Sequence, residues 1–174
     1  MPIRVRQMSL HDVSDVLTIE QDSYEEPWSK RVFDRLLNLL CRQHKSTGIV
    51  AEHDEQIIGF VMYEQRLGKL RILNIAVADV FRRCRVGTRL VDGLIAQLCP
   101  DSLRSIVAIV RETNDSAIAF FCKLGFHGMK VLREHYDDSN EDAYRLEWKL
   151  RAHREIENAQ ATALDNSKED DNAD

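Results

Sequence analysis

The segment that most constrains this chain is residues 73–91, with the sequence LNIAVADVFRRCRVGTRLV. It starts with an apolar stretch typical of a strand, passes through a loop rich in arginine and enters a helix. That helix carries Val91, Leu94, Ile95 and Leu98 at spacings of three and four residues, which place them on one face. The segment therefore predicts a strand, a basic loop and an amphipathic helix in direct succession.

The basic loop has the chemistry of an anion site. Arg82, Arg83 and Arg85 stand just before the helix, whose first backbone N–H groups lack partners within the helix and lie at its positive dipole end. Guanidinium groups add paired donors that suit phosphate oxygens. A solvated surface or a nucleic-acid patch would also use arginines, but the position between strand and helix favours a phosphate-bearing cofactor.

Length and charge limit the class of protein. A chain of 174 residues, 44% hydrophobic and 30% charged, is typical of one soluble globular domain. Its net charge is −5, yet residues 165–174 carry −4 of that, so the rest is nearly neutral. A general nucleic-acid binder is therefore not expected. The acidic segment cannot bury enough apolar area to order itself.

The cysteines and the N-terminal segment point to one compartment. Cys41, Cys84, Cys99 and Cys122 are far apart and have no histidine at metal spacing, so they are expected to be buried or incidental thiols, with no metal site. There is neither a leader-like apolar segment at the start nor an apolar run of membrane-spanning length. The sequence predicts a cytoplasmic protein without a membrane partner.

Hydrophobic periodicity gives the order of elements. Strands are expected at 3–8, 48–51, 57–63, 70–77, 105–110, 126–136 and 144–150. Helices are expected at about 10–24, 30–40, 88–98 and 115–124, and residues 151–164 could form an exposed helix. The order β-α-α-β-β-β-α-β-α-β-β predicts an α/β (α+β) fold with a mixed, mostly antiparallel sheet and helices on both faces. We assign 1–150 to one domain and 151–174 to a C-terminal extension.

Four blocks of sequence resemble a known family. The block NDSAIAFFCKLGF at 114–126, together with the strand and basic loop, is similar to the GCN5-related N-acetyltransferases. The blocks IEQDSYEEPWS at 19–29, LNIAV at 73–77 and EHYDDSNEDA at 134–143 resemble the bacterial ribosomal-protein-alanine N-acetyltransferases within that family. The resemblance covers about residues 3–150 and implies acetyl-coenzyme A as co-substrate.

The resemblance also implies roles for particular residues. The backbone of Ile75, Ala76 and Val77 would pair with the pantetheine arm and polarise the acetyl carbonyl. Asn114 would contact the cofactor, and Trp28 and Tyr136 would flank the acceptor peptide. A loop would wrap the pyrophosphate, formed by Arg82, Arg83, Cys84, Arg85, Val86, Gly87 and Thr88.

Three positions depart from the resembled pattern. The family's glutamate base aligns with Ile109, and its tyrosine acid aligns with Phe121. Neither side chain can transfer a proton, so the catalytic residues are not identified by alignment, and Tyr136 is the remaining candidate. Arg85 stands where the family usually has glycine, and a positive φ there would cost about 1 kcal/mol.

The leading prediction is an acetyl-coenzyme A-dependent N-acetyltransferase that acts on a primary amine. A protein N-terminal α-amino group is the expected acceptor, with a ribosomal protein as a candidate. Two alternatives stay open: a coenzyme A-binding module that has lost catalysis, and an acetyltransferase for a small-molecule amine.

Overall fold

The computed structural model describes residues 2–41, 48–136 and 139–150. A seven-stranded sheet runs through this part of the chain in the order β1-β2-β3-β4-β5-β7-β6. The strands are β1 (Arg4–Gln7), β2 (Gly48–His53), β3 (Gln56–Arg66), β4 (Lys69–Val77), β5 (Ser105–Arg111), β6 (His127–Tyr136) and β7 (Glu141–Lys149). The helices are α1 (Val13–Ser23), α2 (Lys30–Cys41), α3 (Val86–Ile95) and α4 (Asp115–Lys123), with short 3-10 turns at Leu10–Asp12 and Asp79–Phe81.

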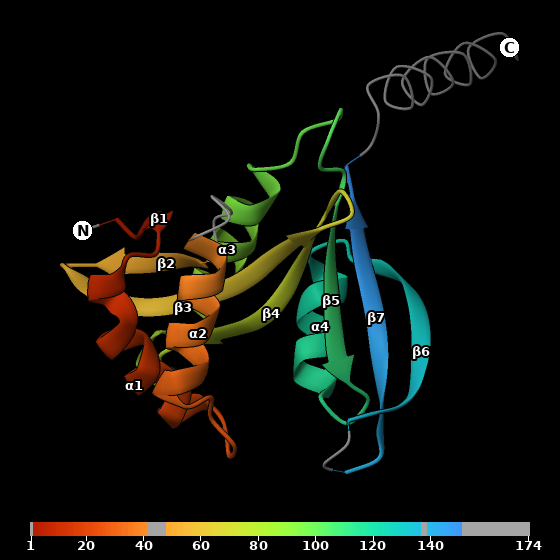
Figure 1. Ribbon diagram of the computed structural model, residues 1–174, viewed down its shortest axis with the longest axis horizontal. Helices are drawn as coiled ribbons and strands as arrows, with labels where there is room; N and C mark the ends of the chain where they lie inside the picture. The colour runs from red at the N-terminus through yellow and green to blue at the C-terminus, as the bar shows by residue number, and fades with distance from the viewer. Residues whose placement is uncertain (1, 42–47, 137–138, 151–174) are drawn as a thin grey trace, which may run out of the picture.

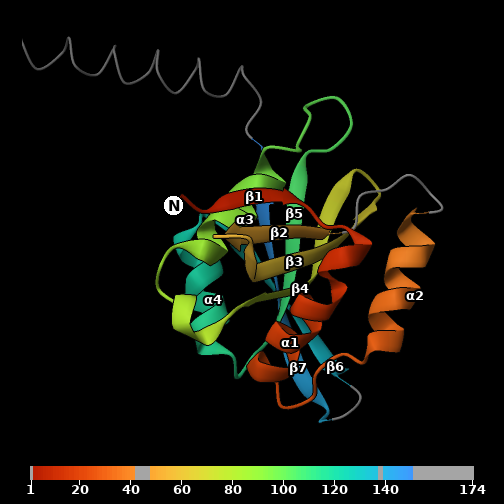
Figure 2. The same ribbon diagram turned by 90° about the vertical axis from the view of Figure 1, so that its left-hand side faces the viewer.

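The predicted fold class and element order are confirmed. Every neighbouring pair of strands is antiparallel except β4 and β5, so the sheet is mixed and mostly antiparallel. Helices α1 and α2 lie on one face of the sheet and α3 lies on the other, as Figures 1 and 2 show. The expected helix at 151–164 and the acidic segment lie outside the described residues.

Two apolar layers hold the helices to the sheet. One cluster packs Val13, Val16 and Ile19 of α1 and Phe33 of α2 on the central strands. The other places Leu90, Val91 and Leu94 of α3 on the opposite face, as their helical spacing predicts. Each fully buried side chain of this size contributes about 1.5–3 kcal/mol, so these layers fix the positions of the helices relative to β4.

The second and third strands of the chain form a β-hairpin. β2 pairs with β3 through a tight turn at Asp54 and Glu55, whose φ angles are 49° and 64°. Positive φ at both turn residues matches the right-handed twist of the flanking strands. The sequence signal for the turn was its polarity alone, since neither position is glycine or asparagine.

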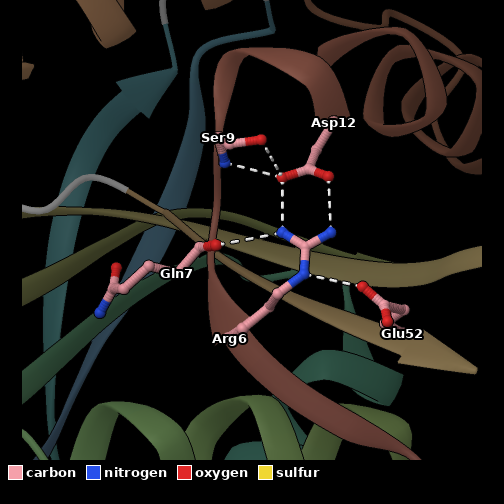
Figure 3. A network of polar contacts seen from close by, with 5 residues as sticks. All are labelled: Arg6, Gln7, Ser9, Asp12 and Glu52. Carbon is pink, nitrogen blue, oxygen red and sulfur yellow. Dashed lines mark hydrogen bonds and ion pairs between the residues drawn. The ribbon is translucent and has the colours of Figure 1, made fainter. Parts of the chain in front are cut away.

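A polar network fixes the first strand to the rest of the fold. Figure 3 shows Arg6 of β1 between two carboxylates, with Nη1 and Nη2 each 2.8 Å from Asp12 and Nε 2.7 Å from Glu52. The backbone N–H of Ser9 donates to Asp12 Oδ2 at 2.7 Å, which is the reciprocal half of a capping box. The Arg6 hydrogen bonds, more than any other contact, lower the pKa of Asp12 to about 2.

The sheet separates between β4 and β5. Their parallel pairing is confined to Lys69–Arg71 with Ser105–Val107, and the two strands then diverge (Figure 1). At the closed end, Glu147 of β7 accepts hydrogen bonds from Lys69 and Ser105, both at 2.7 Å. Two residues beyond Arg71, Leu73 is an extra residue in β4, because Met62 pairs with Asn74 while Tyr63 pairs with Ile72. A bulge of this kind bends the strand and re-aims its side chains.

Candidate active site

A cleft of about 610 Å³ occupies the space where β4 and β5 part. That volume is within the range of about 300–1,000 Å³ that is usual for small-molecule sites. Five segments line it: the end of α1 and the following loop, the middle of β4, the end of β5, the start of α4 and the end of β6. The lining residues include Glu20, Tyr24, Trp28, Asn74, Ile75, Ile109, Arg111, Asn114, Phe121 and Tyr136.

One edge of β4 is open toward this cleft. Ala78 N–H donates to Ile58 of β3 at 2.9 Å, and Ala76 O lies 3.1 Å from where Gly59 of β3 would carry a Cβ. Because amide groups alternate sides along a strand, the backbone groups of Ile75 and Val77 point the other way. Consistent with this, Ile75 O accepts a hydrogen bond of 2.7 Å from the Tyr24 hydroxyl. Ile75 lines the cleft and thus offers backbone groups to a ligand there, and Val77 faces the same side of β4, whereas Ala76 faces β3.

The basic loop turns tightly into α3. Arg83 and Arg85 have φ angles of 64° and 63°, so both are left-handed, and Arg85 is the residue that precedes the helix. The expectation that Arg85 occupies a position suited to glycine is therefore confirmed. Arg82 folds back instead: its guanidinium group is 2.8 Å from Asp79, and its Nε donates to Val77 O at 3.2 Å.

The rest of the predicted phosphate loop falls into exposed and buried parts. Cys84 is exposed, and its N–H donates to Phe81 O at 3.4 Å. Val86 is buried in the core, so only its backbone can contact a ligand. A Cβ on Gly87 would lie 3.1 Å from the Phe120 ring, so the small residue lets α4 approach the start of α3. Thr88 is half-buried in the first turn.

The structure brings Ile109, Asn114 and Phe121 together at the cleft. Asn114 begins α4, and its Oδ1 accepts a hydrogen bond from Ala117 N–H at 3.0 Å, which leaves the amide group for a ligand. Ile109 is half-buried and Phe121 is 3% exposed, and both line the cavity. The walls at these two positions are therefore apolar.

Tyr136, the last residue of β6, lies at the same cleft. The guanidinium carbon of Arg111 is 3.8 Å from the centre of its ring, which is a cation–π contact. Arg111 is held in turn by Glu141 at 3.1 Å. This stacking fixes the tyrosine ring as one wall of the cleft.

Sequence reasoning missed two buried polar residues. Glu20 of α1 is 1% exposed and Asn74 of β4 is 9% exposed, and both line the cleft. Asn74 Nδ2 lies 3.0 and 2.9 Å from the two carboxylate oxygens of Glu20, and Trp28 N–H donates to Oε1 at 2.9 Å. A signal was present, because Glu20 follows Val13 and Val16 at spacings of seven and four, on the inward face of α1.

Burial changes the acidity of two groups beside β4. It is the main cause that raises the pKa of Glu20, although the hydrogen bonds from Trp28 and Asn74 act in the opposite direction. Burial of the hydroxyl, followed by the charge of Glu20, raises the pKa of Tyr24 to about 12. Tyr24 therefore keeps its proton at neutral pH, and Glu20 holds its proton more readily than an exposed carboxyl does.

Two features are absent from the residues that the structure describes. None of their helices is both long and apolar enough to cross a membrane. They also contain no cluster of three or more side chains suited to hold a metal ion. Cys84, Cys99 and Cys122 are free thiols, and all three are exposed rather than buried.

The fold and the cleft agree with comparisons to known proteins. Residues 13–126 match the model of the acetyltransferase (GNAT) family. The chain therefore belongs to this family, and the predicted resemblance is confirmed. The match runs from α1 to the residue before β6, so it includes β4, the basic loop and the start of α4.

Particular relatives carry more specific names. An N-alpha-acetyltransferase of Sulfurisphaera tokodaii is 29% identical, over 82% of this chain and 90% of its own length. A ribosomal protein bS18-alanine N-acetyltransferase of Salmonella typhimurium is 30% identical, over 78% of this chain and 90% of its own. The crystal structure of Ard1 from Thermoplasma volcanium superposes with a TM-score of 0.76 at 26% identity, covering 87% of this chain and all of that one. The relatives from Sulfurisphaera tokodaii and Salmonella typhimurium are N-acetyltransferases by name, as the sequence predicted for this chain.

Proposed function

We propose that this chain transfers the acetyl group of acetyl-coenzyme A to a protein N-terminal α-amino group. The observation that carries the proposal is the open edge of β4, where Ile75 presents backbone groups to a cleft of about 610 Å³ and Val77 faces the same side of the strand. The names of the relatives from Sulfurisphaera tokodaii and Salmonella typhimurium support a protein N-terminus as the acceptor. Ribosomal proteins are the first acceptors to test, and the cytoplasm is the compartment we expect.

The residues present fit acetyl-coenzyme A. The exposed guanidinium groups of Arg83 and Arg85, with the first amides of α3, suit its diphosphate. The open backbone edge at Ile75 and Val77 suits the amide-bearing pantetheine arm, as an added strand does. Backbone donors preset at the reacting carbonyl are worth roughly 3 kcal/mol in comparable reactions. Asn114 at the start of α4 remains our predicted further contact.

The test is acetyl transfer to synthetic peptides. Peptides with a small first residue and a free amino group should gain one acetyl group, detected by mass spectrometry, while free thiol is released from acetyl-coenzyme A. The same peptides with a blocked N-terminus should not react. No turnover above background across peptides, polyamines and other small amines would contradict the proposal, and turnover of small amines alone would change the acceptor.

One observation favours a second candidate, a coenzyme A-binding module without catalysis. Ile109 and Phe121 line the cleft at the two positions where the family resemblance expects a base and an acid. Such a module would be stabilised thermally by coenzyme A yet release no thiol from acetyl-coenzyme A. Turnover in the unmodified protein would exclude it.

A further inference from the structure

A buried carboxylate without a cationic partner lies at the floor of the cleft. Glu20 is 1% exposed, and its hydrogen bonds come from two amides, the backbone N–H of Trp28 and the side-chain Nδ2 of Asn74. No lysine or arginine pairs with it within residues 2–41, 48–136 and 139–150. A buried charge of this kind is costly unless a cation or a proton compensates it.

The neighbouring asparagine adds another buried acceptor. Asn74 is 9% exposed, and its Oδ1 is buried with no hydrogen-bond partner in the described part of the chain. The amide orientation is fixed by Glu20, because the reverse orientation would set Oδ1 against the carboxylate. Both residues line the cleft, so this part of its lining offers oxygen acceptors. A ligand that brings N–H donors and a positive charge would satisfy both residues.

We propose that Glu20 and Asn74 Oδ1 bind the acceptor's α-ammonium group and that Glu20 removes its proton before the amine attacks. This inference rests on the proposed function, because an α-amino group is the cation that such an enzyme must admit. It assigns to α1 and β4 the proton-accepting role that Ile109 on β5 cannot fill.

The proton balance is complete without another reactant. Glu20 takes one proton from the ammonium group, which leaves a neutral amine with a free electron pair. The nitrogen–carbon bond forms, the carbon–sulfur bond breaks, and the departing sulfur takes the second proton that the nitrogen loses. Glu20 then returns its proton to solvent. Its pKa is raised mainly by burial, which brings a carboxyl closer to the working range of a general base.

Other charged groups also face the cleft. Glu25 and Glu26 are exposed on the loop after α1 and add negative charge at its rim, where they attract a cation. On the far wall, Arg111 is paired with Glu141 and stacked on Tyr136. Glu20 differs from the exposed Glu25 and Glu26 in its burial. An ammonium group beside Glu20 loses most of its water, and its electrostatic attraction to the carboxylate is strongest there.

The decisive variant is Glu20→Gln, which keeps the size of the side chain and its bond from Trp28 N–H. We expect kcat/KM for a free-amine peptide to fall by about 10² or more and the acidic limb of its pH profile to disappear. The affinity for coenzyme A should not change, whereas the preference for a free over an N-acetylated peptide in binding should be lost. Glu64→Gln, which makes the same change on β3 outside the cleft lining, is the matched control.

Ile109→Glu provides a rescue in the Glu20→Gln background. It puts a carboxylate on the opposite wall of the same cleft, so it should restore part of the activity. If Glu20→Gln does not fold, carboxyl NMR of the unmodified protein tests the inference. A peptide with a free amino group should shift the Glu20 signal, and the same peptide with an acetylated N-terminus should not. A Glu20 signal unmoved by saturating peptide would overturn the inference.

The two proposals fail in different ways. An unmodified protein that acetylates no amine contradicts the proposed function. An unmodified protein that is active, together with a Glu20→Gln variant of equal activity and unchanged pH profile, contradicts this inference alone.

Discussion

Three single residues adopt a strained backbone conformation or bury a carboxyl group, and each of these features costs free energy. Arg85 is left-handed at the start of α3, Asp12 is charged although it is 6% exposed, and Glu20 is buried beside the cleft. Asp12 is compensated by Arg6, while Glu20 has only amide donors. This contrast separates a carboxylate that stabilises the fold from one that is available to a ligand.

The strain at Arg85 is measurable as stability. We expect Arg85→Gly to raise the free energy of unfolding by up to about 1 kcal/mol, because glycine adopts positive φ without steric cost. Arg89→Gly, which removes the same charge inside α3, should instead lower it by about 1 kcal/mol. Urea unfolding measures both, and equal losses in the two variants would show that the loop does not hold Arg85 in a strained conformation.

The Asp12 network predicts a loss of stability in acid. The pKa of Asp12 is about 2 in the folded protein, below its unfolded value, so its contribution is complete above about pH 4 and disappears as the pH falls toward 2. Asp12→Asn should cost on the order of 2 kcal/mol at pH 7 and flatten the decline between pH 4 and 2. Asp34→Asn, at a more exposed pair with Lys30, should change little. An identical pH dependence in the Asp12 variant and the unmodified protein would refute this assignment.

At the scale of elements, β4 defines the site because its two edges differ. One edge pairs with β3 along its length, and the other pairs with β5 only at Lys69–Arg71. The sequence predicted β4, the basic loop and α3 from local periodicity, but it did not predict where β4 leaves β5. Divergence depends on a bulge at Leu73 and on contacts such as Glu147 with Lys69, which join residues 78 positions apart.

The two edges of β4 should respond differently to ligand. In hydrogen-exchange NMR, the amides of Ile75 and Val77 should exchange rapidly in the free protein and become protected by coenzyme A. The amides of Ala76 and Ala78, which face β3, should be protected in both states. A uniform response of all four amides would mean that the ligand does not pair with the open edge.

At the scale of the whole molecule, the order of elements was predictable and the floor of the cleft was not. The order follows from patterns within ten or twenty residues, which the chain displays clearly. The pair of Glu20 and Asn74 joins residues 54 positions apart on α1 and β4, and only the packed fold brings them together. Ile109 and Phe121 were predicted from the family resemblance, and both lie at the same cleft.

The proposed function requires coenzyme A to bind in the β4–β5 cleft and at the loop before α3. Isothermal titration calorimetry of the unmodified protein with coenzyme A tests it most directly, with Arg83→Glu/Arg85→Glu as the comparison. We expect saturable binding at one site, and at least tenfold weaker binding in the double variant, because two donors to the diphosphate are replaced by like charges. No saturation in the unmodified protein, or equal affinity in the variant, would contradict the account.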